Sequence, residues 1–369
     1  MPTCIRRRGS RAAAALLLMA AARAAAAQAP AAQPNADAPR VRLVATGGTI
    51  SNRTGDRLTA EELVKAMPGV ERYARPEYEQ FTNLASSQLT LDHWLGLAKR
   101  VNELLATDSG LAGIVVTSGT DTLEETAYFL NLTVHSAEPV VVVGSMRNPS
   151  TLGYEGAANL LEGFRVAASP EARGKGVLVV LNDEINAARE VTKTDALRLN
   201  TFQSRPYGVL GVVDADRVVF YRSPVRRHTT ASEFDVAAVT KLPRVDVVLV
   251  YQGADGDLIN AAVDRGAQGI VVAGAGAGAV SGTQREGEVY AVKKGAIVVT
   301  TTRTGSGRIA PPQRGAGGRG GDTAQLTPDE QRRFIAGEDL QPVKARVLLM
   351  LALTKTKDPA EIQRMFSEY

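Results

Sequence analysis

Residues 41–52 read V-R-L-V-A-T-G-G-T-I-S-N. The apolar run at the start of this stretch is too short for a typical helix and predicts a buried strand. Gly47 and Gly48 then end the strand with a turn that residues without a side chain adopt at little cost. In a parallel sheet this turn lies at the carboxyl edge, where open α/β sheets bind ligands. The stretch therefore makes Thr49 a candidate catalytic residue, although most turns of this kind only connect a strand to the next element.

A second stretch joins a strand end to polar residues. Residues 113–117 read G-I-V-V-T and lead into S-G-T-D-T at 118–122, followed by apolar side chains at helical spacing. Thr120 and Asp121 would thus lie at the carboxyl end of a strand and the amino end of a helix. Backbone N–H groups and the positive end of the helix dipole suit a carboxylate or a developing oxyanion there. Threonine and aspartate are also common helix caps, so this stretch alone leaves capping and catalysis both open.

A lysine supplies the group that a threonine nucleophile lacks. A threonine hydroxyl is weakly nucleophilic at its ordinary pKa and needs a base nearby. V-T-K-T at 191–194 follows the strand predicted at 177–181, so Lys193 can reach the same edge of the sheet from another loop. A desolvated lysine beside a threonine can accept a proton, and Asp121 would orient it. An isolated lysine is more often a solvated surface charge, so both interpretations stay open on these residues alone.

The alternation of apolar runs and helical stretches predicts an α/β protein of two domains. We expect a larger N-terminal catalytic domain at 41–222 with a mostly parallel, Rossmann-like sheet, a linker at 223–243, and a smaller C-terminal α/β domain at 244–369 with its own parallel sheet. The predicted strands are 41–46, 113–117, 140–143, 177–181, 247–251, 269–273 and 296–301, and the predicted helices include 58–67, 91–105, 123–134, 342–353 and 359–368.

The first 27 residues have the pattern of a secretory signal peptide. Arginines precede an Ala/Leu run at 12–22, and small residues suit cleavage after Ala27. We therefore expect a periplasmic or secreted protein, with Sec and Tat export both open. The apolar run is too short to span a bilayer comfortably, so we expect no membrane contact after cleavage. Residues 28–40 are rich in Ala, Pro and Gln and predict a disordered leader.

Charge and metal-ligand content exclude several classes of function. Removing the signal takes away five arginines and no acids, so the formal net charge changes from +4 to −1 and gives no reason to expect a nucleic-acid partner. The only cysteine, Cys4, leaves with the signal, which excludes disulfides and cysteine metal sites. The three histidines lack ligand spacing, so we expect no metal site.

Several motifs in order along the chain resemble one family. Residues 141–147 read V-V-V-G-S-M-R, residues 177–183 read V-L-V-V-L-N-D, and residues 344–359 read K-A-R-V-L-L-M-L-A-L-T-K-T-K-D-P. Together with T-G-G-T-I at 46–50, T-S-G-T-D-T-L-E-E-T-A-Y-F-L at 117–130 and V-T-K-T at 191–194, they resemble the bacterial type II (secreted) L-asparaginases and the related glutaminase-asparaginases. The resemblance runs from about Val41 to Tyr369.

The resemblance implies a role for each candidate residue. Thr49 corresponds to the nucleophile that forms an acyl-enzyme with the side chain of L-asparagine, which water then hydrolyses to L-aspartate, with ammonia released. Thr120 corresponds to a second catalytic threonine that works with Asp121 and Lys193. The substrate-binding positions are Ser86, which corresponds to a serine that holds the α-carboxylate, the neighbouring Ser87, and Thr120 and Asp121, of which Asp121 also binds the α-ammonium. The family implies no metal and no cofactor, and a homotetramer built as a dimer of dimers.

The sequence also departs from the family pattern. The segment after Thr49 normally carries a tyrosine that partners the first threonine, but residues 51–57 contain none and form a short polar loop. Ala277 and Ala279 stand where relatives often have asparagines that reach an adjacent site, and residues 304–308 contain no glutamate. A glutaminase-asparaginase, or a periplasmic amino-acid-binding protein that has lost turnover, therefore remains an alternative. The Gly-rich insert at 309–325 predicts a mobile surface loop.

Overall fold

The computed structural model describes residues 37–311 and 325–369, together with Met1. The predicted signal peptide (1–27) apart from Met1, most of the predicted leader (28–40) and most of the predicted Gly-rich loop (309–325) lie outside the described residues. The structural statements below concern the described ranges.

The last residues of the predicted leader and the first residue of the predicted Gly-rich loop are part of the fold. Ala38 is fully buried, and the first strand begins at Arg40, whose guanidinium donates two hydrogen bonds to the Asp108 carboxylate at 2.9 and 2.7 Å. Ile309 is buried and pairs with Glu338 in an isolated β-bridge. Residues 38–40 therefore belong to the folded domain rather than to a disordered leader, because their backbone and side chains find partners there.

The larger sheet has eight strands in the order β12-β11-β8-β7-β6-β5-β1-β4. The strands from β4 to β7 run parallel to one another, whereas β8, β11 and β12 pair antiparallel, which confirms the predicted mostly parallel sheet. Its strands are β1 (Arg40–Gly47), β4 (Arg75–Leu84), β5 (Leu111–Thr117), β6 (Val140–Val143), β7 (Val177–Leu181), β8 (Glu184–Ala187), β11 (Gly211–Val213) and β12 (Val218–Phe220).

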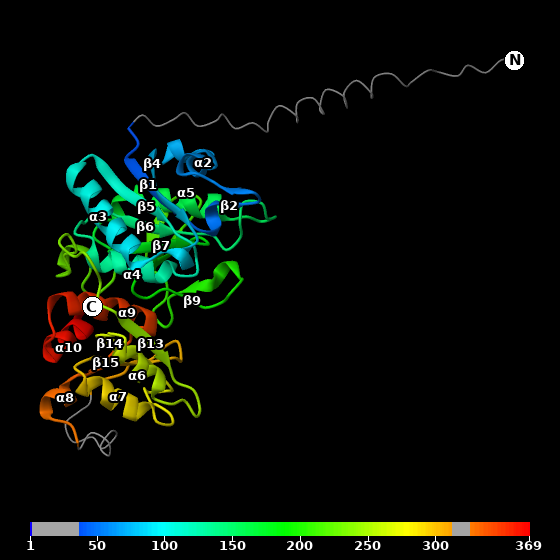
Figure 1. The fold of residues 1–369 in the computed structure, drawn as a ribbon. Helices are drawn as coiled ribbons and strands as arrows, with labels where there is room; N and C mark the ends of the chain where they lie inside the picture. Colours follow the sequence, from blue (N-terminus) through cyan, green and yellow to red (C-terminus); the bar gives the residue numbers. More distant parts are fainter. Residues whose placement is uncertain (2–36, 312–324) are drawn as a thin grey trace.

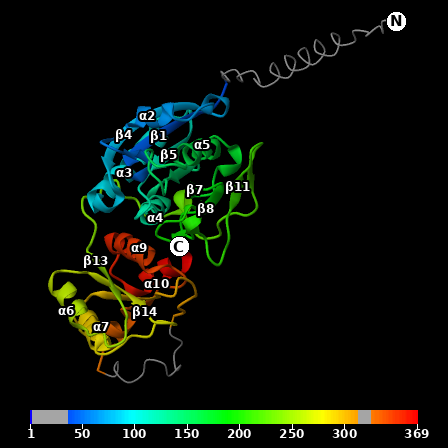
Figure 2. The same ribbon diagram turned by 90° about the vertical axis from the view of Figure 1, so that its right-hand side faces the viewer.

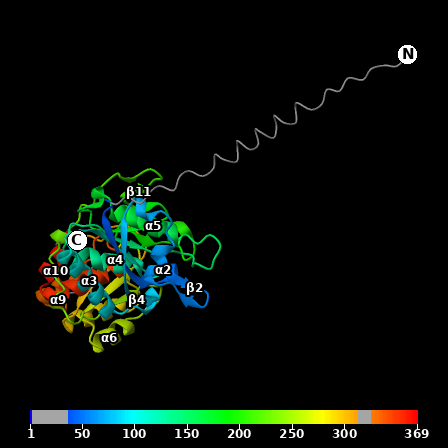
Figure 3. The ribbon, with the colours of Figure 1, turned by 90° about the horizontal axis from the view of Figure 1, so that it is seen from above.

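Helices cover both faces of this sheet, which explains why its central strands are apolar throughout. Successive side chains of a strand point to opposite faces. Val142 packs into the cluster beneath α3 and α4, while Val141 and Val143 pack into the cluster beneath α2 and α5. Figure 3 shows the two pairs of helices on opposite sides of the strands. These helices are α2 (Ala60–Lys65), α3 (Leu91–Thr107), α4 (Leu123–Thr133) and α5 (Gly156–Ala167).

Strand β4 was not among the predicted strands. It reads R-P-E-Y-E-Q-F-T-N-L, and each of its residues is partly or fully exposed. An edge strand of this kind pairs with one neighbour only, here β1, and its polar composition carries no buried-strand pattern. The pairing continues to the register Gly47↔Leu84, so the residues after β4 arrive beside the turn that precedes Thr49.

A separate four-stranded sheet follows, and all of its strands are parallel. This confirms the smaller C-terminal α/β unit, with strands shifted by one or two residues from their predicted bounds. The fourth strand, β16, was not predicted. The elements are β13 (Val245–Leu249), β14 (Gly269–Gly274), β15 (Ile297–Thr302) and β16 (Phe334–Ala336), with α6 (Asp257–Asp264), α7 (Gln284–Lys293), α8 (Pro328–Arg332), α9 (Pro342–Lys355) and α10 (Pro359–Glu368).

The last two helices lie between the two sheets (Figures 1 and 2). α6 and α7 pack on one face of the small sheet, and the apolar residues of α9 and α10 join the same cluster as α3, α4 and the larger sheet. Eight of the nine residues of α9 from Ala345 to Leu353 are buried, and Arg346 is the exception. Helix α9 is therefore apolar on nearly all sides because it is covered by both domains.

A buried ion pair crosses this junction. Arg189, in the loop after β8, donates two hydrogen bonds to the Asp339 carboxylate at 2.8 and 2.7 Å and a third to the backbone carbonyl of Tyr369 at 2.8 Å. The two charged side chains are 8% and 13% exposed. Burial alone would raise the pKa of Asp339, but the hydrogen bonds and charge of Arg189 outweigh it and hold that pKa well below 3.8.

We expect Asp339→Asn to lower the free energy of unfolding by about 3–5 kcal/mol at neutral pH, because it leaves the Arg189 charge buried without a counter-charge. The difference from the wild type should shrink below about pH 4, since a carboxylate with a depressed folded-state pKa loses its stabilising contribution as it takes up a proton. Urea denaturation at several pH values measures both effects. Asp329→Asn is the control and should change the free energy of unfolding little, because the Asp329 side chain is 83% exposed in its ion pair. Equal small losses for both variants would contradict the structural role.

Candidate active site

Thr49 lies where two loops pack backbone against backbone. β1 ends at Gly47, and Thr49 opens a short 3-10 turn at Thr49–Ser51. Gly48 has φ of 89°, a conformation that residues with a side chain rarely adopt. A Cβ atom added to Gly48 would lie 2.3 Å from the backbone nitrogen of Gly119. The contact requires glycine at position 48 and brings the Thr49 turn against the loop that carries Thr120.

Ser86 lies beneath the same two loops. It follows β4 and is 4% exposed. Its hydroxyl accepts a hydrogen bond from the backbone N–H of Thr122 at 3.4 Å, and its carbonyl accepts one from the Thr122 hydroxyl at 3.1 Å. A Cβ atom at Gly119 would lie 2.7 Å from the Ser86 Oγ. The structure thus brings Ser86 to the candidate site, while Ser87, one residue further, is exposed.

Lys193 contacts both predicted partners. Its Nζ donates to Thr120 Oγ1 at 3.1 Å and to Asp121 Oδ1 at 3.0 Å. The lysine side chain is 16% exposed and Thr120 is 5% exposed, whereas the Asp121 side chain is 69% exposed. These three residues come from the end of β5 and from the two-residue strand β9 (Thr192–Lys193), which pairs with β10 (Phe202–Gln203). The lysine is therefore largely removed from water, while the carboxylate faces it.

Helix capping does not account for the polar residues at the start of α4. Thr122 is the N-cap residue, but its side chain makes no capping hydrogen bond to the helix. The Thr122 hydroxyl bonds to Ser86 instead, and the Thr120 hydroxyl bonds to Lys193. The capping interpretation that the sequence left open therefore fails here, because these hydroxyls make long-range contacts.

Two charged residues behind the site were missed by sequence reasoning. Glu124 accepts hydrogen bonds from the hydroxyl of Thr192 at 2.9 Å and from the backbone N–H of Lys193 at 3.2 Å. Lys344 of α9 is fully buried, lies 3.8 Å from Glu124 and donates to the carbonyls of Arg189, at 3.0 Å, and Val191. A charged residue at the start of the apolar helix sequence K-A-R-V-L-L-M-L is the signal that could have identified it. These contacts fix the strand that carries Lys193 between Glu124 of the N-terminal domain and Lys344 of the C-terminal domain.

Lys344 should make folding pH-dependent. Desolvation lowers its pKa from 10.5 to about 8, although the charge of Glu124 opposes the shift. Between these values the unfolded chain binds a proton that the folded chain lacks, so the free energy of unfolding rises with pH. Relative to Lys344→Met, the wild type should therefore gain stability between about pH 8 and pH 10, as measured by urea denaturation. Lys355→Met, an exposed lysine of the same helix, controls for the loss of a lysine as such. Parallel wild-type and Lys344→Met profiles would refute this account.

The short polar loop expected after Thr49 is a small hairpin. Strands β2 (Asn52–Arg53) and β3 (Asp56–Arg57) pair antiparallel. Arg53 forms ion pairs with Asp56 and, at 3.1 Å, with Glu62. The hairpin thus holds its shape through charge pairing, without an aromatic side chain.

Ala277 and Ala279 lie in a tight turn of the C-terminal domain. Ala277 and Ala279 are both exposed and follow β14. The turn is closed by two hydrogen bonds of 2.9 Å between the backbones of Ala275 and Ala279. Their exposed methyl groups offer no polar contact to another molecule.

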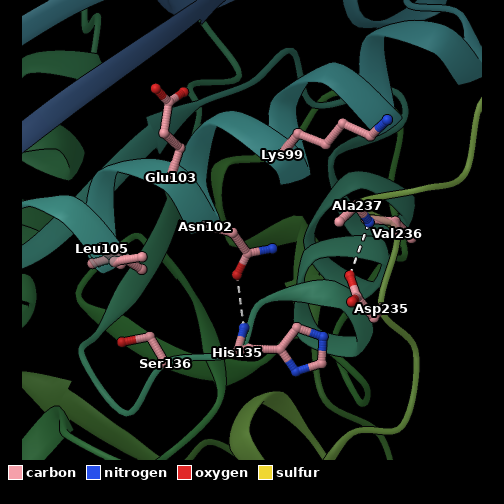
Figure 4. A pocket seen from close by; sticks show the side chains of 10 residues that line it. Lys99, Asn102, Glu103, Leu105, His135, Ser136, Asp235, Val236 and Ala237 are labelled. Carbon is pink, nitrogen blue, oxygen red and sulfur yellow. Dashed lines mark hydrogen bonds between the residues drawn. The ribbon is translucent and has the colours of Figure 1, made fainter.

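A cavity of about 680 Å³ lies away from these residues (Figure 4). It is lined by α3, by the turn at 135–136 and by residues 235–237 of the chain between the two sheets. Two polar side chains at its wall already bind backbone N–H groups, Asn102 that of His135 and Asp235 that of Ala237, both at 2.8 Å. None of the predicted site residues lines it.

Residues 37–311 and 325–369 contain neither a metal-ligand cluster nor a membrane-spanning helix. No group of three or more His, Cys, Asp or Glu side chains there could hold a metal ion. In the same ranges, no helix combines the length and apolar character needed to cross a bilayer.

Two family models match the chain in succession. The model described as "Asparaginase, N-terminal" matches residues 40–226, and the "Glutaminase/Asparaginase C-terminal domain" matches residues 244–366. The chain belongs to the asparaginase family. This confirms the resemblance carried by the two threonine motifs, the lysine motif and the C-terminal motif.

Individual asparaginases are similar over nearly their full length. L-asparaginase 2 of Bacillus subtilis (strain 168) is 45% identical over 90% of this chain and 87% of its own. L-asparaginase 2 of Escherichia coli (strain K12) is 39% identical over 90% of this chain and 93% of its own. The crystal structure of a Campylobacter jejuni protein named "Probable Cytoplasmic L-asparaginase" superposes with a TM-score of 0.82 at 40% identity, covering 90% of this chain and 100% of that one.

Proposed function

We propose that this protein hydrolyses L-asparagine to L-aspartate and ammonia through a threonine acyl-enzyme. The observation that carries the proposal is the Lys193 amine, which is 3.1 Å from the Thr120 hydroxyl and 3.0 Å from the Asp121 carboxylate. Family membership supports the reaction class, and this geometry supports the assignment of a proton-transfer group.

Thr49 is the proposed nucleophile. Its hydroxyl oxygen attacks the carbon of the substrate's side-chain amide and gives up its proton. The proton passes to the amide nitrogen of the tetrahedral intermediate, and the C–N bond then breaks to release ammonia. The ester that remains is hydrolysed when water attacks the same carbon, which frees Thr49 and releases aspartate. The close contact between Gly48 and Gly119 supports this role, because it brings the nucleophile's turn against the Thr120 loop.

Thr120, Lys193 and Asp121 form the proposed proton-transfer group. The amine of Lys193 is mostly shielded from water and lies within hydrogen-bond reach of the Thr120 hydroxyl, which supports a role in proton transfer. In the proposed mechanism the Lys193 amine accepts the proton of the Thr120 hydroxyl. The Thr120 oxygen then activates the attacking hydroxyl or water by accepting its proton. The Glu124 and Lys344 contacts to the β9 segment support a fixed position for this amine.

The proposed substrate pocket is polar and open to solvent. Ser86 would bind the α-carboxylate, Ser87 and Thr120 would line the same pocket, and the exposed Asp121 carboxylate would bind the α-ammonium by a charge-assisted hydrogen bond. L-Glutamine differs from L-asparagine by one methylene, so a glutaminase-asparaginase activity is the closest second candidate. The description of the matching C-terminal family model, which includes glutaminase, favours testing it.

We further propose export, assembly and domain limits from the sequence pattern. The arginine-led apolar segment at 1–27 supports cleavage and a periplasmic or secreted location. The resemblance to type II enzymes supports a homotetramer. The gap between the two matched ranges supports domains at 41–222 and 244–369 with a linker between them.

We expect Thr49→Ala to reduce kcat for L-asparagine by about a thousandfold or more, because the covalent route is lost, with aspartate affinity nearly unchanged. Ammonia release measures kcat, and calorimetry measures aspartate binding. Thr107→Ala, whose hydroxyl only bonds to the carbonyl of Glu103 at the end of α3, is the control and should retain full activity. Retention of more than about a tenth of wild-type kcat by Thr49→Ala would remove Thr49 from the nucleophile's role. A wild-type protein that binds aspartate and releases no ammonia from either amide would instead be an amino-acid-binding protein.

We expect Lys193→Met to lower kcat by about a hundredfold or more while KM for L-asparagine changes much less, because the substitution keeps the length of the side chain and removes its amine. Steady-state kinetics across pH provide the measurement. Lys175→Met removes a half-buried lysine that bonds to Ser223, outside the candidate site, and serves as the matched control. Normal turnover in Lys193→Met would mean that Lys193 is a structural charge and that Thr120 is activated in another way.

A further inference from the structure

A tyrosine from a different loop reaches the turn that carries Thr49. The hydroxyl of Tyr154 donates a hydrogen bond of 2.8 Å to the carbonyl oxygen of Ile50, the residue after Thr49. The two partners are 104 residues apart in the sequence. Ile50 is fully buried, so its side chain and its carbonyl are both held. The turn is therefore anchored on the side chain of Ile50 and on its backbone.

The ring of Tyr154 lies so close to Gly156 that no side chain fits at that position. A Cβ atom added to Gly156, the first residue of α5, would lie 2.4 Å from both the hydroxyl oxygen and a ring carbon of Tyr154. The ring also packs on the apolar cluster beneath α2 and α5. Burial raises the pKa of the Tyr154 phenol, so the hydroxyl keeps its proton and remains a donor across the physiological range.

The loop that carries Tyr154 is itself held in shape. The Glu155 carboxylate accepts hydrogen bonds from the backbone N–H groups of Met146 and, at 3.3 Å, Arg147. The hydroxyl of Ser150 accepts one from the backbone N–H of Thr54, at the tip of the β2–β3 hairpin, at 2.8 Å. One loop thus contacts the segment after β1 at two points, the turn of Thr49 and the tip of the hairpin.

We propose that Tyr154 is a positioning residue that holds the Thr49 turn in its reactive geometry, a task for which the short segment 51–57 has no tyrosine of its own. The inference rests on the proposed function. Tyr154 acts through the Ile50 carbonyl and does not exchange protons with the substrate. Small displacements of a nucleophile slow its reaction strongly, so one backbone hydrogen bond affects turnover more than binding.

Tyr154→Phe tests the proposal, because it removes only the hydroxyl. We expect kcat for L-asparagine to fall by about five- to thirtyfold, with KM and aspartate affinity within about twofold of the wild type. The kcat–pH profile should keep its shape at a lower level, since no titrating group is removed from the proton-transfer path. Tyr290→Phe is the matched control and should match the wild type. It removes a hydroxyl of α7 that donates to Asp264 of α6 at 2.6 Å, in the C-terminal domain.

A second set of variants tests the contact between the Tyr154 ring and Gly156. Gly156→Ala should displace the ring and lower kcat to a similar extent as Tyr154→Phe. In a Tyr154→Ala background the added methyl group meets no ring, so Gly156→Ala should cause no further loss of kcat. This non-additivity is the signature of two residues that act through one contact.

The outcomes separate the inference from the function on which it rests. Absence of ammonia release by the wild type would defeat the proposed function and the inference with it. An active wild type with unchanged kcat in Tyr154→Phe would overturn the inference alone. Loss of aspartate affinity and thermal stability in proportion to kcat would also overturn it, because that pattern indicates general damage to the fold. A changed kcat–pH profile would overturn it too, since Tyr154 would then take part in proton transfer.

Discussion

The candidate site depends on the contact between Gly48 and Gly119. These residues follow the carboxyl ends of neighbouring parallel strands, β1 and β5, and their backbones approach so closely that no side chain fits between them. The contact places the turn of Thr49 directly beside the loop of Thr120 and Asp121. Ser86 fills the space on the other side of Gly119. Larger residues at either glycine would push the two threonines apart, whatever else remained in place.

The second domain contributes to the site from behind. Lys344 lies in the helix between the two sheets, and its amine binds carbonyls of the segment that leads to Lys193. Burying a lysine is costly, and the nearby Glu124 and the backbone carbonyls compensate for part of that cost. The Arg189–Asp339 pair secures the same junction. Movement of one domain against the other would therefore disturb the position of Lys193.

Much of the fold followed from local sequence patterns. The runs at 140–143 and 177–181 are strands with the predicted bounds, because short apolar stretches between turns have few alternatives in an α/β chain. Strand β4 and strand β16 escaped prediction, since one is polar and the other has three residues. Segment 52–57 was expected to be a short polar loop, and the antiparallel pairing of β2 with β3 makes it a hairpin.

The sequence by itself determined which residue types end the strands: two threonines after glycines, an aspartate and a lysine. It did so because strand ends and turns are encoded by neighbouring residues. Only the tertiary structure decided which of these ends meet. It joined Ser86 to Thr122, buried Lys344 behind Lys193 and brought Tyr154 to Ile50. Contacts between residues so far apart in the chain leave no periodic signal, because they depend on how the sheets and helices pack.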